Sequence, residues 1–293
     1  PDRGGIGLSQ VSAGYRHTCV LWVDGEMACW GSNGYGELGI GNTSAIGDEA
    51  GEMGESLGLV SLPSGRTATQ IAAGEHMTCA VLDESGDGNL ACWGWGDSGR
   101  LGSESVGTVG DSSDDMGDDL ELVELGTGRT VDSIGVGYGS SCVILDDGSV
   151  KCWGNNANGR TGYGTGSGSI GDAPGEMGDS LATLDLGAGR TATAIDAGTS
   201  HTCALLDDGS VKCWGSGSYG ALGIGNTTSM GDGAYEMGDD LPAVDLGTGR
   251  YASRISVAGY HSCAILDSGV VKCWGYNSGM LGQEHSEHIG TGA

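Results

Sequence analysis

The chain has 293 residues, 61 of them glycine and none of them phenylalanine, and its 39 acidic and 12 basic side chains give a formal charge of −27. A surface this acidic repels nucleic acids and anionic lipid, so we expect no nucleic-acid partner. No run of apolar residues is long enough to cross a membrane, so we expect no membrane insertion. High glycine and acid content is typical of disordered chains, but ten cysteines and seven tryptophans in a repeating order indicate a folded repeat protein.

Five copies of one unit follow one another along the chain. Each copy carries two cysteines, the second of which opens a Cys-Trp-Gly triplet, and the first cysteines lie 60, 63, 61 and 60 residues apart. Units of this length with several short strands predict the blades of a β-propeller, because one blade cannot bury its own faces. We therefore predict a single domain over residues 1–293, with blades at residues 1–64, 65–127, 128–188, 189–249 and 250–293.

The fourth copy shows the expected elements in chain order. Short apolar stretches separated by turns predict strands at residues 194–197, 202–206, 211–214 and 242–246. No stretch has helical periodicity, so the predicted fold is all-β, with mostly four-stranded antiparallel blades. The fifth copy stops at Ala293, before its fourth strand, so we expect an incomplete last blade with an exposed strand near residues 270–274. Either five blades form the ring, or residues beyond this chain complete it.

The spacing of the two cysteines fits a disulfide across a β-hairpin. The loop Asp207–Gly209 is centred midway between Cys203 and Cys213, so the two sulfurs face each other across antiparallel strands. The same geometry predicts five disulfides, Cys19–Cys29, Cys79–Cys92, Cys142–Cys152, Cys203–Cys213 and Cys263–Cys273. Zinc binding and free buried thiols are the alternatives. Disulfides at this density indicate secretion to the cell surface or beyond, and we expect either a removed leader or a longer secreted protein.

A glycine-rich acidic connector between the copies repeats carboxylates at fixed offsets. The four sets are Asp48, Glu52 and Glu55; Asp111, Asp115 and Asp118; Asp172, Glu176 and Asp179; and Asp232, Glu236 and Asp239. Calcium prefers oxygen ligands, and such a loop offers carboxylates and carbonyls, so these residues are a candidate Ca²⁺ site. The alternative is that they cap turns or are solvated. One methionine in each connector is predicted to plug the space between blades: Met53, Met116, Met177 and Met237.

Histidine recurs just before the first cysteine of four copies, as His17, His76, His201 and His261. One equivalent side chain per blade predicts a repeated structural hydrogen bond near the propeller axis. Catalysis needs unlike residues gathered in one place, and no phosphate loop, nucleophile elbow or repeat-breaking acid pair is present, so we expect no enzyme. Outside the repeat, His285 and His288 with Glu284 and Glu287 are a weak candidate for a transition metal, with a flexible end as the alternative.

Two glycosylation sequons begin at Asn42 and Asn226 and follow the same Leu-Gly-Ile-Gly segment in copies one and four. Both asparagines are therefore predicted to lie on equivalent exposed loops. If the source is eukaryotic we expect N-linked glycans there; otherwise they are ordinary turn residues.

The segment from Gly198 to Gly223 combines His-Thr-Cys, Asp-Asp-Gly, Cys-Trp-Gly and Gly-x-Leu-Gly elements. It resembles the repeat of the regulator of chromosome condensation family in its disulfide-bearing extracellular form, and the likeness extends over essentially the whole chain. The resemblance implies a β-propeller, usually of seven blades, in which the segment from Trp to Gly-x-Leu-Gly lines a structural turn. Here that segment lies at residues 30–39, 93–102, 214–223 and, one residue shorter, 274–282.

The founding member of that family is a guanine-nucleotide exchange factor, so the resemblance also suggests nucleotide exchange. We consider this the least favoured hypothesis for this chain. The even spacing of the copies leaves no inserted wedge, and disulfides with a charge of −27 disfavour the nucleus. The leading hypothesis is a non-catalytic extracellular module that self-associates as a building block of a coat, matrix or filament. The alternative is a soluble secreted recognition domain that binds a protein or glycan through non-repeating aromatic side chains on one face, such as Trp22, Trp95 and Tyr163.

Overall fold

A computed structural model of the chain describes residues 5–83, 88–282 and 285–291. The chain forms two compact units. Unit 1 comprises Pro1–Ile134 and Ile170–Leu181, and unit 2 comprises Gly135–Ser169 and Ala182–Ala293. No helix in the part of the chain that the structure describes is long and apolar enough to cross a membrane.

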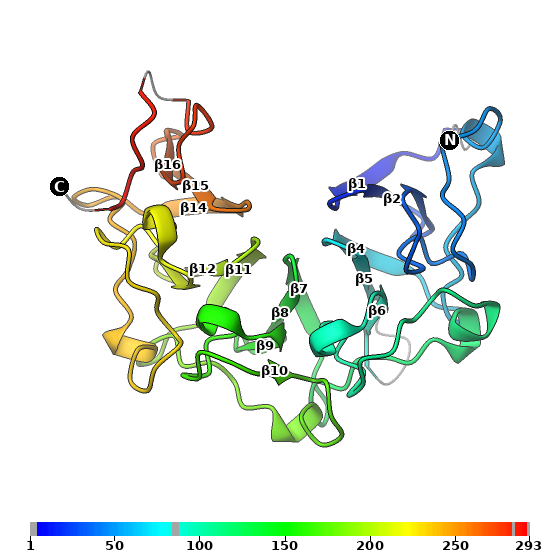
Figure 1. Cartoon of the computed structure of the whole chain (residues 1–293), viewed down its shortest axis with the longest axis horizontal. Helices are drawn as coiled ribbons and strands as arrows, with labels where there is room; N and C mark the ends of the chain where they lie inside the picture. Colours follow the sequence, from blue (N-terminus) through cyan, green and yellow to red (C-terminus); the bar gives the residue numbers. More distant parts are fainter. Residues whose placement is uncertain (1–4, 84–87, 283–284, 292–293) are drawn as a thin grey trace. The chain divides into compact units, whose positions relative to one another are not determined.

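Five antiparallel sheets, one for each sequence copy, carry the fold (Figure 1). Four sheets have three strands each, in the orders β1-β2-β3, β4-β5-β6, β11-β12-β13 and β14-β15-β16, and the third copy has the order β10-β9-β8-β7. The strands are β1 (Leu8–Ala13), β2 (His17–Trp22), β3 (Met27–Gly31), β4 (Ala68–Ala73), β5 (Met77–Leu82), β6 (Leu90–Gly94), β7 (Val131–Val136), β8 (Ser140–Leu145), β9 (Val150–Asn155), β10 (Ser169–Ile170), β11 (Ala192–Ala197), β12 (His201–Leu206), β13 (Val211–Gly215), β14 (Ala252–Val257), β15 (His261–Leu266) and β16 (Val271–Gly275). The all-β, five-bladed prediction is confirmed.

Single turns of 3-10 helix interrupt the described loops. They are η1 (Gly54–Ser56), η2 (Asp97–Gly99), η3 (Ser113–Asp115), η4 (Gly117–Asp119), η5 (Ala157–Gly159), η6 (Gly178–Ser180), η7 (Ser218–Gly220) and η8 (Gly238–Asp240). They fall in the acidic connectors and in the loops that follow the Cys-Trp-Gly triplets, where glycine is frequent and longer helices are disfavoured.

The hairpin between the second and third strands of each blade positions the two cysteines. Cys203 on β12 lies opposite Cys213 on β13, as the loop geometry predicts. All five predicted disulfides are present: Cys19–Cys29, Cys79–Cys92, Cys142–Cys152, Cys203–Cys213 and Cys263–Cys273. The described chain has no free cysteine, so the zinc and free-thiol alternatives are wrong.

The fourth strand expected in the fourth blade is reduced to a single bridge. Lys212 bridges Ala243, and the Val244 N–H donates to the Val211 carbonyl at 2.8 Å. Pro242, just before the bridge, has no N–H with which to extend the ladder. In the third blade the extra strand is β10, which comes before the acidic connector rather than after it.

The tryptophan of the Cys-Trp-Gly triplet ties its blade to the preceding one. The buried Trp93 indole donates from Nε1 to the Glu37 carbonyl at 3.2 Å. Equivalent bonds run from Trp214 to Arg160 at 3.1 Å and from Trp274 to Ala221 at 2.9 Å. Because a buried indole N–H needs an acceptor, this bond fixes the loop of one blade against the hairpin of the next.

Apolar side chains on two blade faces are exposed. In unit 1, Leu8 and Val11 of β1 are 62% and 65% exposed. In unit 2, Val270 and Val271 are 58% and 59% exposed, which agrees with the exposed strand expected near residues 270–274. Trp274 departs from that expectation, because it packs into the core shared by blades four and five.

Candidate functional site

The middle carboxylate of each acidic connector caps a turn. Glu176 Oε2 accepts hydrogen bonds from the N–H groups of Gly171, Asp172 and Ala173 at 2.9–3.1 Å. The equivalents are Glu52, which accepts from Gly47 and Glu49; Asp115, which accepts from Gly110 and Ser112; and Glu236, which accepts from Gly233. These backbone donors also lower the pKa of Glu52. Turn capping is therefore confirmed for this member of each set.

The last carboxylate of three connectors joins its blade to the preceding one. Asp118 accepts from the Ser64 N–H at 2.6 Å and the Ser64 hydroxyl at 2.9 Å. Asp179 does the same with Thr127 at 2.9 and 2.7 Å, and Asp239 accepts from the Ala188 N–H at 3.0 Å. Glu55, its equivalent in the first connector, is exposed.

The first carboxylate of a connector pairs with the middle one. Burial raises the pKa of Asp111, and the hydrogen bond and repulsion from Asp115 raise it further. The same causes raise the pKa values of Asp172 beside Glu176 and of Asp232 beside Glu236. Within the described ranges, no three Asp, Glu, His or Cys side chains gather closely enough to hold a metal ion. Calcium binding at the connectors, including Asp48, stays a prediction.

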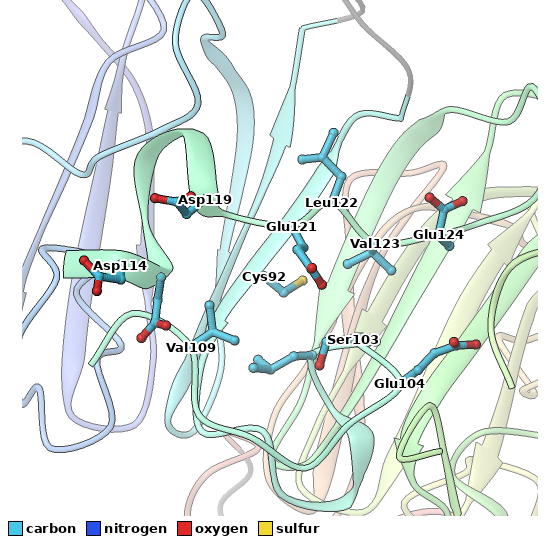
Figure 2. Close-up of a pocket in the computed structure, with 13 residues that line it drawn as sticks. Cys92, Ser103, Glu104, Val109, Asp114, Asp119, Glu121, Leu122, Val123 and Glu124 are labelled. Atoms are coloured by element: carbon cyan, nitrogen blue, oxygen red, sulfur yellow. The ribbon is translucent and has the colours of Figure 1, made fainter. Parts of the chain in front are cut away.

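Six carboxylates line a cavity of about 340 Å³ in unit 1, which we call the acidic cavity (Figure 2). Asp114, Asp115 and Asp119 come from η3 and η4, Glu121 and Glu124 from the segment after η4, and Glu104 from the loop after η2. Glu104 already accepts from the Gly175 and Met177 N–H groups at 2.9 Å. A second cavity, of about 500 Å³ in unit 2, has Asp185, Glu236, Asp239 and Asp240 in its lining. Such linings suit cationic groups.

Two of the four recurring histidines make the predicted structural hydrogen bond. His17 Nε2 lies 2.9 Å from the Thr78 hydroxyl of the next blade, and His201 Nε2 lies 2.7 Å from the Ser262 hydroxyl. Burial lowers the pKa of both imidazoles to about 4, so both are neutral at pH 7.

The prediction is wrong for His76. Strand pairing places Met77 opposite Gly94, where His17 lies opposite Gly31 in blade one. His76 is therefore one residue ahead of the strand position, in the loop, and it belongs to an aromatic group described below. His261 keeps the strand position and lines a cavity of unit 2.

The connector methionines plug blades in three cases out of four. Met116 and Met177 are buried, and Met237 is partly buried against the core of blades three and four. Met53 is 40% exposed. It belongs to the first connector, so the prediction is wrong for this methionine.

Both sequon asparagines lie exposed on equivalent loops, as predicted. The side-chain oxygen of each accepts the N–H two residues later at 2.8 Å, at Ser44 for Asn42 and at Thr228 for Asn226. Glycosylation itself stays a prediction.

The segment with His285 and His288 is tied to the loop after β16. His288 Nδ1 accepts from the Asn277 N–H at 3.0 Å, and the Asn277 side chain donates to the carbonyls of His285 and Glu287 at 2.7 and 3.1 Å. Glu284, the fourth residue of the predicted metal site, lies outside the described residues.

Two groups of aromatic side chains form at the loops where neighbouring blades meet. The first aromatic group, in unit 1, is Tyr35, His76 and Trp95; the second aromatic group, in unit 2, is Tyr219, Tyr260 and Tyr276. Their members correspond by position. Tyr35 and Tyr219 follow the triplet tryptophan by five residues, Trp95 and Tyr276 follow it by two, and His76 and Tyr260 precede the first cysteine by three.

In each group a central tyrosine contacts the other two rings. The Tyr35 ring centroid lies 5.0 Å from that of His76 and 5.1 Å from that of Trp95. The Tyr219 centroid lies 5.8 Å from that of Tyr260 and 5.0 Å from that of Tyr276. The same loop positions therefore bring three rings together twice, but at different angles: Tyr35 stacks on Trp95 at 21°, whereas Tyr219 meets Tyr276 at 66°. In the second group the His288 ring also lies 4.9 Å from that of Tyr219 and 5.0 Å from that of Tyr276.

Charged side chains close the first aromatic group. The Arg100 guanidinium lies 4.2 Å from the Trp95 ring centroid, and its Nη1 lies 3.4 Å from Glu75 Oε2. His76 stands 3.6 Å from a carboxylate oxygen of both Glu37 and Glu75. Glu37, Glu75 and Arg100 are all buried, so these charges satisfy one another inside the loop cluster.

At the second aromatic group the same three positions are uncharged. Ala221 stands at the position of Glu37, Gly259 at that of Glu75, and Met280 at that of Arg100 when the loops are aligned on the following leucine. What remains is a cavity of about 880 Å³, which we call the aromatic cavity. Its lining includes all three tyrosines of the group together with Tyr138, His261 and Arg160, and none of the described lining residues is acidic.

Polar groups surround the rings of the aromatic cavity. Arg160 donates from Nε to the Ala157 carbonyl at 3.1 Å and from Nη1 to the Thr199 carbonyl at 2.9 Å. Ser200 also lines the cavity and is 8% exposed, and its hydroxyl has no hydrogen-bond partner among the described residues. A buried hydroxyl without a partner costs free energy that a bound ligand would recover.

The aromatic cluster expected from the sequence is wrong in two of its three members. Trp22 is buried inside blade one. The Tyr163 hydroxyl donates to the Ala182 carbonyl at 2.8 Å, and burial raises its pKa. Of the three, Trp95 belongs to a loop aromatic group. Both groups can be found by aligning the five copies position by position, in the loops after the Cys-Trp-Gly triplets and in the loops before the first cysteines.

Known proteins share this architecture. The Regulator of chromosome condensation (RCC1) repeat matches residues 8–37, 131–160, 192–221 and 253–283. The chain is similar to the ultraviolet-B receptor UVR8 of Arabidopsis thaliana, with 27% identity over 284 residues, 95% of this chain and 55% of the receptor. The chain thus spans about half the length of that relative.

Two solved structures show the same fold at low sequence identity. Yeast RCC1 (Prp20), in its crystal structure with Kap60, superposes with a TM-score of 0.54 and 17% identity, covering 97% of this chain and 74% of that one. The ectodomain of the Physcomitrella patens receptor kinase CR4 superposes with a TM-score of 0.52 and 19% identity, covering 94% of this chain and 54% of that one.

Proposed function

We propose that this chain belongs to the RCC1 repeat family, whose repeat matches four of its five blades, and that it is a non-catalytic interaction module. It works in an oxidising compartment outside the cell and recognises its partner through the aromatic cavity of unit 2. The observation that carries this proposal is the cavity itself, where three tyrosines meet and none of the lining residues that the structure describes is acidic, in a chain with 39 acidic residues. Tyrosine is enriched at recognition sites because it offers a large apolar ring and a polar hydroxyl at low entropic cost.

The known proteins support a binding role. The yeast RCC1 structure holds that protein bound to Kap60, and the CR4 structure is that of an ectodomain. The first is an example of a similar fold bound to another protein, and the second is an example of a similar fold in an ectodomain. Five disulfides support the same compartment for this chain, since they persist where the environment is oxidising.

The test of the proposed function compares partner capture by the full chain and by two variants. The chain is immobilised with its disulfides intact and exposed to the extracellular fraction of its source cells. We expect a retained species that the wild type and Tyr235→Asn hold and that the double variant Tyr219→Asn with Tyr276→Ala loses. Tyr235 is a matched control, because it is 92% exposed and lies outside the aromatic cavity. Equal retention on all three proteins would contradict the proposal.

Assembly into a coat or filament is the second candidate function, and the exposed apolar blade faces favour it. Leu8 and Val11 are exposed on β1 of unit 1, and Val271 is exposed on β16 of unit 2. Exposed apolar side chains on a sheet can pack against a further sheet. Light scattering of the purified chain in Ca²⁺ and in chelator tests this candidate together with the calcium prediction. A large species that dissociates in chelator supports both, whereas a monomer near 29.3 kDa in both buffers contradicts calcium-linked assembly.

A further inference from the structure

We propose that the aromatic cavity of unit 2 binds an uncharged oligosaccharide. This inference rests on the proposed function and names the chemistry of its ligand. Three observations carry it: the absence of acid from the described residues of the cavity wall, the arrangement of the rings, and the hydroxyl-rich lining with one unsatisfied hydroxyl. The backbone conformation of the central tyrosine guides the choice of variants.

The charge of the wall excludes cationic and anionic ligands in different ways. A cation finds its counter-charges in the acidic cavity of unit 1 and in the second acidic cavity of unit 2, not here. An anion is repelled at long range by a formal charge of −27. The one cationic side chain in the wall, Arg160, already donates to the carbonyls of Ala157 and Thr199 and holds its own loop. The wall therefore favours an uncharged ligand.

The ring faces offer stacking surfaces of the size of a sugar ring. Tyr219 and Tyr276 are nearly perpendicular to each other, with an interplanar angle of 66°, and Tyr219 and Tyr260 meet at 79°. Tyr219, Tyr260 and Tyr138 are 41–44% exposed, and His288 lies against the Tyr219 ring with a centroid distance of 4.9 Å, so part of each exposed tyrosine can contact a ligand. The C–H groups on one face of a pyranose are attracted by the negative face of an aromatic ring, which makes tyrosine a good platform for saccharides.

The remaining lining favours a ligand that carries many hydroxyl groups. Ser200 is buried with an unpartnered hydroxyl, and Ser216 donates to Ser218 at 3.0 Å next to it in the wall. A purely apolar ligand would bury such groups without a partner, at a cost of about 1–3 kcal/mol each. A volume of about 880 Å³ also matches small-ligand sites rather than the broad flat surfaces of protein interfaces.

Tyr219 adopts a left-handed backbone conformation, with φ of 61°. The equivalent residues of blades two and three, Ser98 and Asn158, have φ of 61° and 59°. Asparagine tolerates this region more readily than tyrosine does, so the wild-type residue is the less favourable one for this backbone conformation. Asn158 thus shows which residue suits the loop when no ring is needed.

The experiment titrates the full oxidised chain with uncharged hexasaccharides of α-1,4-glucan, β-1,4-glucan, β-1,3-glucan, β-1,4-mannan, xylan and chitin, followed by calorimetry. We expect saturable binding of at least one of them. Its Kd should rise by about tenfold or more in Tyr219→Asn and in Tyr276→Ala, and should be unchanged in Tyr235→Asn. Tyr235 also has a positive φ, of 66°, so it controls for the backbone effect of the same substitution.

Three results would overturn the inference. The first is that the folded wild type binds none of the six probes. The second is that Tyr219→Asn and Tyr276→Ala bind as the wild type does. The third is that a random peptide pool, and no saccharide, binds in a way that depends on Tyr219, which assigns the cavity to a peptide. If saccharide binding fails while partner capture still depends on Tyr219 and Tyr276, the proposed function stands without this inference; if capture also fails, both are contradicted.

Discussion

The two aromatic groups use the same loop positions and differ in what fills the space between the rings. In unit 1, Arg100 covers Trp95 and pairs with Glu75, and His76 lies between two carboxylates. In unit 2, the corresponding Met280 is 57% exposed, and no described residue of the cavity wall carries a carboxylate. The repeat therefore supplies a fixed frame of rings, and a few side chains around them decide whether the frame is closed or open to a ligand.

The frame itself is held by bonds that recur from blade to blade. The triplet tryptophan, the connector aspartate and the strand histidine each reach from one blade to its neighbour, as Trp93, Asp118 and His17 do. These groups are buried or act on the backbone, so they constrain the fold. The loop residues outside this set are free to differ, and function resides in them.

Removing the arginine of unit 1 should have the largest effect, and it tests whether the charged group in unit 1 is closed while the cavity in unit 2 is open. We expect Arg100→Met to lower the free energy of unfolding by about 3 kcal/mol, because it leaves the buried Glu75 without its cation. Met280→Ala in unit 2 should cost less than about 1 kcal/mol, since that side chain is largely exposed. Urea denaturation of both variants measures the difference. Equal losses would show that the two sites are not closed and open as described.

The two units should respond differently to acid, because they contain different buried titrating groups. His17 and His201 have folded pKa values of about 4, below the ordinary 6.5, so the unfolded chain binds their protons first as the pH falls. Each histidine therefore contributes on the order of 3 kcal/mol to the free energy of unfolding above pH 6.5, and this contribution is lost as the pH falls from 6.5 to 4. Burial raises the pKa of Asp196 in unit 2 to about 6, which has the opposite sign: its contribution is present below pH 3.8 and lost as the pH rises through 6.

Unit 1 should therefore lose more protection than unit 2 when the pH falls from 7 to 4.5. Hydrogen exchange followed by mass spectrometry measures each unit separately. In Asp196→Ser the advantage of unit 2 should disappear while its bond to the next blade survives, because Ser12 accepts from the Ala73 N–H at 2.9 Å at the equivalent place in unit 1. Faster acid opening of unit 2 in the wild type would contradict these assignments.

Transplanting the charges of unit 1 into unit 2 tests whether they alone close the site. We expect the double variant Gly259→Glu with Met280→Arg to fold, because an added Cβ at Gly259 meets only the Thr199 hydroxyl oxygen, at 3.3 Å. The new arginine should cover Tyr276 as Arg100 covers Trp95, and ligand or partner binding should weaken by about tenfold or more. Calorimetry with the wild-type ligand checks this, and unchanged affinity in a folded variant would refute it.

Replacing Tyr219 by a residue that accepts a positive φ should change the free energy of unfolding only slightly. Tyr219→Asn should leave the free energy of unfolding unchanged or raise it by up to about 1 kcal/mol, because asparagine accepts a positive φ more readily than tyrosine. Tyr35→Asn in unit 1 should give no such gain, since Tyr35 does not have a positive φ. Thermal unfolding of the two variants decides the point. A clear loss at Tyr219 would mean that its ring stabilises the loop rather than serving a ligand.

The sequence predicts the blades and their disulfides well, but it does not predict which side chains form the aromatic cavity. Cys203 and Cys213 are equidistant from a glycine-containing turn, so hairpin symmetry alone fixes their disulfide. His76 is misassigned because its distance from Cys79 exceeds that of His17 from Cys19 by one residue, and strand pairing decides which residue faces the next blade. Whether a tyrosine such as Tyr163 is exposed depends on how the connector 19 residues later folds back onto it, as its hydrogen bond to the Ala182 carbonyl shows, and no local pattern records this.

Nitration of tyrosine with and without the bound ligand tests the central claim most directly. The ligand is the oligosaccharide or captured partner that the wild type binds, and modified residues are identified by mass spectrometry. We expect Tyr219, Tyr260 and Tyr276 to become protected together, while Tyr35 in unit 1 and Tyr235 outside the cavity react as in the free chain. Protection of Tyr35 instead, or equal reactivity of all tyrosines, would contradict the claim that the open aromatic cavity of unit 2 is the recognition site.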